Sequence, residues 1–227
     1  MTHTNIAPVR PDSAASGPEM TLGIVLAPRS DHYTRASFQA HYEAFHAPLF
    51  YSFAKPAIGR YARNHIVRAI GTDPHFDTIS EFGIFPDKRG ELSRILHSPE
   101  ARALEEDVHT FLAERGNSFT VSERLIAGPP RYFEPGPVAK RAILLRTNHP
   151  DDADFDDYAK TVAARLGNAA LRVTLSVWNR EPPPPMDAML MIWPAEGASL
   201  PDPIEPPTPI TIAHTLDLDG YMTAWRD

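Results

Sequence analysis

The chain has 227 residues, of which 42% are hydrophobic, and it contains no cysteine. This length allows one large or two small packed domains, and the lack of cysteine excludes disulfides, thiolate metal sites and a cysteine nucleophile. The 29 acidic residues exceed the 22 basic ones, giving a formal net charge of −7, which argues against duplex DNA or an anionic membrane surface as the main partner. Ten of the 24 prolines lie between Pro182 and Pro209.

Residues 1–19 contain Pro, Ser and Ala but lack the apolar run of a signal peptide. We therefore expect a disordered N-terminal arm and no targeting segment. The apolar runs elsewhere are too short to cross a bilayer. These features favour a cytoplasmic protein.

Residues 20–128 alternate between strand and helix patterns. Strands are expected at 21–27, 58–70, 78–85 and 118–126, and apolar residues recur at helical spacing from Thr34 and again over 90–115. Pro48 interrupts the first helix and predicts a break at His46 and Ala47. The order strand, helix, strand, strand, helix, strand is typical of a ferredoxin-like unit, an antiparallel sheet with both helices on one face.

The pattern begins again after a stiff linker at 129–137. Residues 138–227 predict strands at 141–147, 171–178, 189–193 and 210–218, and a helix at 154–166. Where a second helix would be expected, Pro194–Pro209 excludes one. We interpret this half as a degenerate second ferredoxin-like unit without its second helix. Its proline-rich segment could cover the sheet or form a disordered loop, and we favour the covering role.

Histidines are concentrated near the N-terminus, with five of the ten between His32 and His75. No pair has the spacing of a zinc-binding helix, so we expect no metal site. His46 is the most interesting because it precedes the break predicted at Pro48, where its side chain could be aimed toward the sheet. It would then act as a proton donor or acceptor, and the alternative is a helix-capping role.

The second and third strands carry polar side chains. Tyr61, Arg63 and His65 share one face of the second strand, and Glu81 lies on the third. If this face lines a cavity, Tyr61, His65 and Glu81 offer a phenol, an imidazole and a carboxylate for proton transfer. The alternative is a solvated sheet face with a cross-strand ion pair.

Other signals are weaker. Asp107 and His109 are expected to be exposed charges on the second helix, and Trp178 and Trp193 either line an apolar cavity or pack in the core. The sequence contains no glycine motif for nucleotides and no G-x-S-x-G elbow.

Four stretches of the first half together resemble a known family. FQAHYEAFHAPLF, IGRYARNHIV, ISEFGIF and LHSPEARALEEDVHTFL follow one another between residues 38 and 112. They resemble the EthD domain of the dimeric α/β-barrel superfamily, over about residues 20–130. The resemblance implies an α+β fold in which two ferredoxin-like units enclose a cavity. Because both units lie in this chain, we expect a pseudo-dimeric barrel with one site.

The resemblance implies cofactor-free chemistry on a small aromatic or polyketide-like ring compound. Together with the residues above, it predicts a lyase or isomerase with the catalytic candidates His46, His65, Tyr61 and Glu81. The substrate-binding candidates are Asn64, Arg63, Tyr51 and Trp178. His46 or His65 would be the general acid or base, and Glu81 would orient a histidine or relay a proton.

The expected partner is a small-molecule substrate, with no cofactor, metal, nucleic acid or membrane, and a homodimer is compatible with the family. Two alternatives remain open. One is a non-catalytic small-molecule-binding or accessory protein of a degradation pathway, and the other is a haem- or oxygen-using relative on the same fold.

Overall fold

The protein is described by a computed structural model over residues 20–225, except 115, 131–136, 150–152 and 180–184. The expected N-terminal arm, most of the expected linker and residues 182–184 of the proline-rich region lie outside the described residues. Within them, no helix is long and apolar enough to cross a membrane.

The described strands form a closed barrel in which every neighbouring pair is antiparallel. They are β1 (Thr21–Ala27), β2 (Ile58–Ile70), β3 (Thr78–Ile84), β4 (Asn117–Ala127), β5 (Val138–Thr147), β6 (Ala170–Trp178), β7 (Ala188–Pro194) and β8 (Ile210–Trp225). Their order is β1-β3-β2-β8-β5-β7-β6-β4, and β4 pairs with β1 to close the barrel. Each half of the chain therefore supplies one contiguous half of the barrel.

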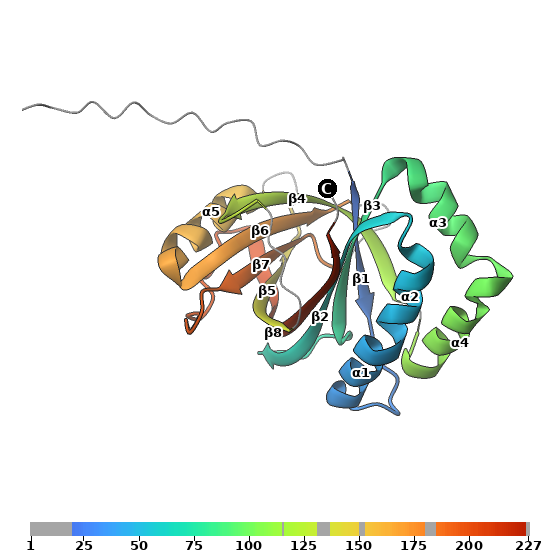
Figure 1. The fold of residues 1–227 in the computed structure, drawn as a ribbon. Coiled ribbons are helices and arrows are strands. Elements are labelled where there is room, and N and C mark those ends of the chain that lie inside the picture. The colour runs from blue at the N-terminus through green and yellow to red at the C-terminus, as the bar shows by residue number, and fades with distance from the viewer. Residues whose placement is uncertain (1–19, 115, 131–136, 150–152, 180–184, 226–227) are drawn as a thin grey trace, which may run out of the picture.

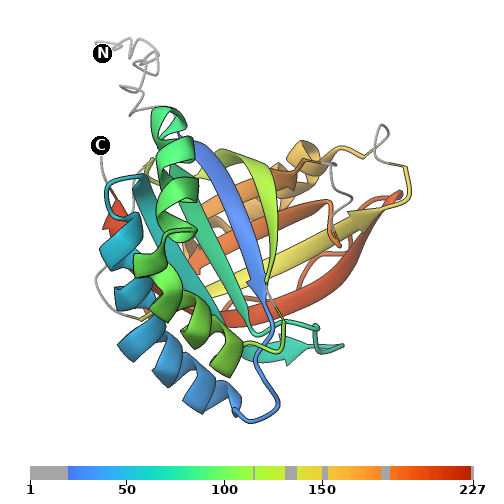
Figure 2. The ribbon, with the colours of Figure 1, turned by 90° about the vertical axis from the view of Figure 1, so that its right-hand side faces the viewer.

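Helices cover the two halves unequally. The helices are α1 (Arg35–His41), α2 (Ala47–Ala54), α3 (Arg89–Leu96), α4 (Arg102–Phe111) and α5 (Phe155–Leu166). Figure 1 shows α1 to α4 on one side of the barrel and α5 on the opposite side. In Figure 2 the first four helices, blue to green, lie across the outer face of the N-terminal strands. The α+β class expected from the sequence is thus confirmed.

The buried apolar side chains form three clusters. One fills the barrel, and the others lie between the sheet and α5 and between the sheet and the helices α1, α2 and α4. Because successive strand residues point to opposite faces, β2 and β3 contribute both to the barrel interior and to the layer under the helices.

The predicted break before Pro48 is wrong in form. Residues Tyr42–His46 make a π-helical turn that joins α1 to α2, and the Ala47 N–H bonds to the Tyr42 carbonyl. The helical path therefore continues through His46, and Pro48 lies in the first turn of α2, where a proline is tolerated.

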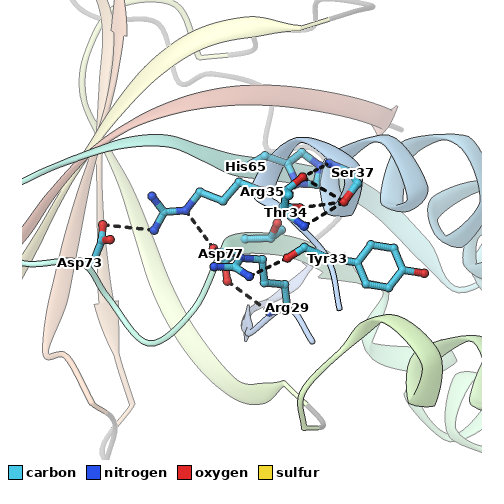
Figure 3. A network of polar contacts seen from close by, with 9 residues as sticks. Arg29, Tyr33, Thr34, Arg35, Ser37, His65, Asp73 and Asp77 are labelled. Atoms are coloured by element: carbon cyan, nitrogen blue, oxygen red, sulfur yellow. Dashed lines mark hydrogen bonds and ion pairs between the residues drawn. The ribbon is translucent and has the colours of Figure 1, made fainter. Parts of the chain in front are cut away.

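Asp77 fixes the start of α1. Its carboxylate accepts hydrogen bonds from the Arg29 backbone N–H and side chain and from Arg35 Nε at 3.0 Å. Thr34 and Ser37 form a capping box at the same helix end. Figure 3 shows both arginines directed at Asp77, so the loop before β3 holds the beginning of α1 in place.

The proline-rich segment partly takes the place of a helix on the second half. Leu200 and Ile204 pack against the cluster under α5. Arg141 Nη1 donates to the Pro201 carbonyl at 2.8 Å, and the Tyr158 hydroxyl donates to the Ile204 carbonyl at 2.7 Å. Residues 200–204 therefore cover the sheet, as expected, and no helix occurs over 195–209.

Candidate active site

A cavity of about 610 Å³ lies between the outer face of the N-terminal sheet and the helices α2, α3 and α4. Its walls are mainly apolar and aromatic, and Phe50, Phe82 and Leu104 are among the lining side chains. His46, Tyr42 and Tyr61 bring polar groups to it from the π-helical turn and β2. A concave apolar pocket with few polar groups is the usual form of a small-molecule site.

One buried carboxylate is shared by two histidines beside this cavity. Asp107 Oδ2 lies 2.8 Å from His46 Nδ1, and Asp107 Oδ1 lies 2.7 Å from His41 Nε2. An ionised carboxylate only accepts hydrogen bonds. Each of these imidazole nitrogens therefore carries a proton and donates it to Asp107.

His46 is held in the form of a general base. Burial lowers the pKa of its imidazole, while the hydrogen bond to Asp107 opposes that effect. Because Nδ1 carries the proton shared with Asp107, a neutral His46 has its lone pair on Nε2. Among the described residues, Nε2 has no hydrogen-bond partner, which leaves it available to a molecule in the cavity.

The π-helical turn brings the two histidines to one carboxylate. In an α-helix, residues five apart point about 140° away from each other. The π-helical bonding links residues five apart, so that they lie one above the other. His41 and His46 therefore face the same side of the helical path, toward Asp107 on α4.

Two tyrosines border His46. Its ring lies 4.7 Å from that of Tyr42, whose hydroxyl is 2.9 Å from Ser80 Oγ. Tyr61 is fully buried in the cavity wall, and its hydroxyl has no hydrogen-bond partner among the described residues. Burial raises the pKa of both phenols, so both remain protonated near neutral pH.

Glu81 does not share a face with Tyr61 and His65, contrary to the interpretation that grouped them. Glu81 pairs with Ala62, and Tyr61 pairs with Phe82. Glu81 and Asn64 therefore point into the barrel, and Tyr61 and His65 point to the helix side. The sheet therefore separates Glu81 from the other predicted catalytic residues, Tyr61 and His65, because neighbouring strand positions point to opposite faces.

Inside the barrel, Glu81 belongs to a buried polar network. Arg60 forms ion pairs with Glu81 and, at 2.7 Å, with Glu123. Asn64 Nδ2 donates to Glu81 Oε1 at 2.8 Å, and Lys140 Nζ donates to Asn64 Oδ1 at 2.7 Å. A void of only about 10 Å³ adjoins this network, room for about one water molecule.

The network changes the ionisation of its members. Burial alone would raise the pKa of Glu81, but Arg60 and Lys140 hold it below its ordinary value. Burial lowers the pKa of Lys140 to about 8, although Glu81 opposes this shift. The network is thus a set of compensated charges within a packed barrel.

His65 lies on the helix side, but both its ring nitrogens are engaged. Nε2 lies 2.7 Å from Glu43 Oε1, and Nδ1 lies 2.7 Å from Thr78 Oγ1. Arg63 forms an ion pair with the same Glu43. His65 does not line the cavity. Its two hydrogen bonds join β2 to the π-helical turn, which carries Glu43, and to β3, which carries Thr78.

The remaining substrate-binding candidates also lie outside the cavity wall. Tyr51 is half-buried on α2 and packs against the cluster under the helices. Arg63 stacks over the Tyr61 ring at 4.7 Å. Trp178 is buried inside the barrel with the apolar cluster there.

Asp107 and His41 were missed by the sequence interpretation, which took Asp107 for an exposed charge. Asp107 is buried, whereas His109 is exposed as expected. The signal was present: Asp107 is three residues after Leu104 and four before Phe111, in phase with the apolar face of α4. A carboxylate on such a face requires a buried partner.

The described residues contain no group of histidine and acidic side chains arranged to hold a metal ion.

Fold and cavity together define an α+β protein with a closed antiparallel barrel and a small-molecule pocket between sheet and helices. Residues 30–115 match the family model of the EthD domain. The resemblance seen in the sequence is thereby confirmed.

Among solved structures, the chain is similar to a proposed monooxygenase from Lactobacillus acidophilus, with a TM-score of 0.52 and 11% identity, covering 90% of this chain and 96% of that one. A proposed monooxygenase from Fusobacterium nucleatum gives a TM-score of 0.46 at 9% identity, covering 89% and 92%. At these identities the likeness concerns the fold alone. No curated protein matches the sequence.

Proposed function

We propose that the cavity under α2, α3 and α4 is the active site of a cofactor-independent lyase or isomerase that moves protons on a small aromatic or polyketide-like ring compound. The observation that carries the proposal is His46, which lines an apolar cavity and whose Nδ1 is bonded to buried Asp107, while Nε2 has no partner among the described residues. An imidazole oriented by a carboxylate is the usual form of a general base.

In the proposed reaction, His46 Nε2 removes a proton from a carbon next to a carbonyl group. The electron pair passes to the carbonyl oxygen, and we assign the unpaired hydroxyl of Tyr61 to that oxygen. Return of the proton to another atom gives isomerisation, and departure of a leaving group gives elimination. Asp107 stabilises the imidazolium that forms between the two steps.

The architecture supports a matching division of the chain. The strand order β4-β1-β3-β2 recurs as β8-β5-β7-β6, the order of two ferredoxin-like units placed side by side. We propose that residues 20–128 form one unit and 138–227 a second, degenerate one. The second supplies half of the barrel, and the first alone carries the catalytic groups.

The test uses β-tetralone, an enolisable bicyclic ketone, in deuterium oxide, with deuterium incorporation next to the carbonyl followed by NMR. We expect the protein to accelerate exchange, and His46→Ala to reduce the acceleration by about 10²–10⁴-fold. His109→Ala, which removes an exposed histidine of α4, is the control and should match the wild type.

Two results would count against the proposal. Exchange of the ketone by His46→Ala at the wild-type rate would remove His46 from the reaction. Binding of the ketone at the cavity without any exchange would instead favour a non-catalytic binding protein.

A further inference from the structure

We propose that His41 is a solvent-facing positioning residue of this site, which acts on His46 through the shared carboxylate of Asp107. The inference rests on the function proposed above, since it assigns a role within the same proton-transfer group. His41 itself does not line the cavity.

The Asp107 carboxylate is held by both histidines. Both oxygens of Asp107 are occupied, one by each imidazole, and its side chain is only 3% exposed. The orientation of the carboxylate is therefore fixed from two sides. Removal of His41 would leave a buried carboxylate oxygen without this partner, which is costly and loosens the orientation in which the carboxylate meets His46.

The path of the chain also brings His41 and His46 to the same carboxylate. An uninterrupted α-helix would direct His41 and His46 to different sides, whereas the π-helical turn Tyr42–His46 directs both to Asp107. Such turns are rare and frequently occur at functional sites. A turn that served His46 alone would not need to bring His41 to the same carboxylate.

The two histidines differ in their exposure to solvent. The His41 side chain is 25% exposed, against 10% for His46. The rings of Tyr33, Phe45 and Phe111 surround His41 at 5.0–5.6 Å. His41 can therefore exchange protons with solvent while His46 faces the cavity.

A charge on His41 changes the pKa of His46. A positive charge on His41 draws on the same carboxylate and lowers the pKa of His46. The other charged groups near His46 are Asp107 and Glu43, which both raise that pKa. The same cavity is also lined by Arg102 and Glu105 of α4, whose charges have opposite signs, and by His97, which follows α3.

The test compares His41→Phe with His41→Gln in the full-length protein. The His46 imidazole is titrated by NMR, and exchange of β-tetralone is measured in parallel. His41→Phe removes both hydrogen bond and charge. It should raise the pKa of His46 and slow exchange about tenfold, the order expected for an outer partner of a catalytic group.

His41→Gln separates the two effects. Its amide N–H can still donate to Asp107, so exchange should return to within about threefold of the wild type. The amide carries no charge, so the pKa of His46 should stay raised. If His41→Phe does not fold, titration of His46 in His41→Gln still tests whether His41 affects the pKa of His46.

The proposal is overturned if His46 titrates in both variants as it does in the wild type. It is also overturned if the glutamine and phenylalanine variants slow exchange equally. These outcomes are distinct from failure of the proposed function, which shows in His46→Ala alone, because the titration of His46 reports on His41 whether or not the ketone reacts.

Discussion

Asn64 and His65 are adjacent in β2 and serve opposite sides of the sheet. The Asn64 amide bonds Glu81 and Lys140 inside the barrel, while the His65 ring bonds Glu43 and Thr78 under the helices. The sheet thus separates the buried charge network inside the barrel from the layer that contains the cavity. Substitutions on the two sides should have different consequences.

Glu81→Gln should destabilise the fold without changing the chemistry of the site. The change leaves the Arg60 and Lys140 cations undercompensated in the barrel, a loss of about 3 kcal/mol for a broken buried pair. Urea denaturation measures it, with Glu106→Gln as the exposed ion-pair control at under about 1 kcal/mol. A large loss of β-tetralone exchange in folded Glu81→Gln would contradict the prediction.

His65→Ala should also act on stability. It removes the partners of Glu43 Oε1 and Thr78 Oγ1, so we expect a loss of about 1–3 kcal/mol in the free energy of unfolding. Exchange by the folded variant should stay within about threefold of the wild type, since both ring nitrogens are already engaged. A loss comparable to that of His46→Ala would show that His65 takes part in the reaction.

Asp107→Asn should reduce exchange strongly while preserving the shape of the cavity. His41 and His46 bond to different oxygens of Asp107, and an amide places an NH2 donor at one of these two positions, so one imidazole loses its acceptor. We expect a loss on the order of 10²–10⁴-fold, as for other groups that orient a catalytic imidazole. Exchange at the wild-type rate by a correctly folded variant would refute this role of the carboxylate.

Lys140 should make stability rise with pH. Its pKa is about 8 in the folded protein against 10.5 in the unfolded chain, so between these values the unfolded state binds more protons. The cost of the buried cation is therefore full below pH 8 and relieved as the pH rises toward 10.5, by about 3 kcal/mol at most. Urea denaturation at a series of pH values should show this rise in the wild type and a smaller one in Lys140→Met.

Two glycine-to-alanine substitutions should have opposite signs. Gly90 lies in α3 with nothing within 4 Å of an added Cβ, so alanine should stabilise the fold by about 0.5–1 kcal/mol. At Gly220 an added Cβ would lie 2.4 Å from Lys140 Cε, within the buried network. Gly220→Ala should therefore be destabilising, and thermal unfolding of both variants checks the contrast.

Most of the fold could be predicted from the sequence because its signals are local. The β-rich stretches, the helical spacing of apolar residues and the prolines after Pro194 each mark an element without reference to the rest of the chain. The turn at Tyr42–His46 could not be predicted, because proline indicates only a disturbance and tertiary contacts with Asp107 accompany the π-helical form.

The candidate site was harder to predict from the sequence than the fold. His46 and Tyr61 were predicted and do line one cavity. The placement of Glu81 depended on which face of β2 meets which face of β3, and that register is set by pairing across the sheet, which a single strand pattern does not contain. Asp107 lies 61 residues from His46 along the chain, so only the packing of α4 brings them together.

The two halves of the barrel meet where β4 pairs with β6 and where β2 pairs with β8. Both of these joints are made within one polypeptide, so the chain itself fixes the local concentration of one half around the other. Assembly of the barrel is therefore a unimolecular process, and its completeness does not follow the mass-action law that governs barrels built from separate subunits. Dilution should leave the barrel intact.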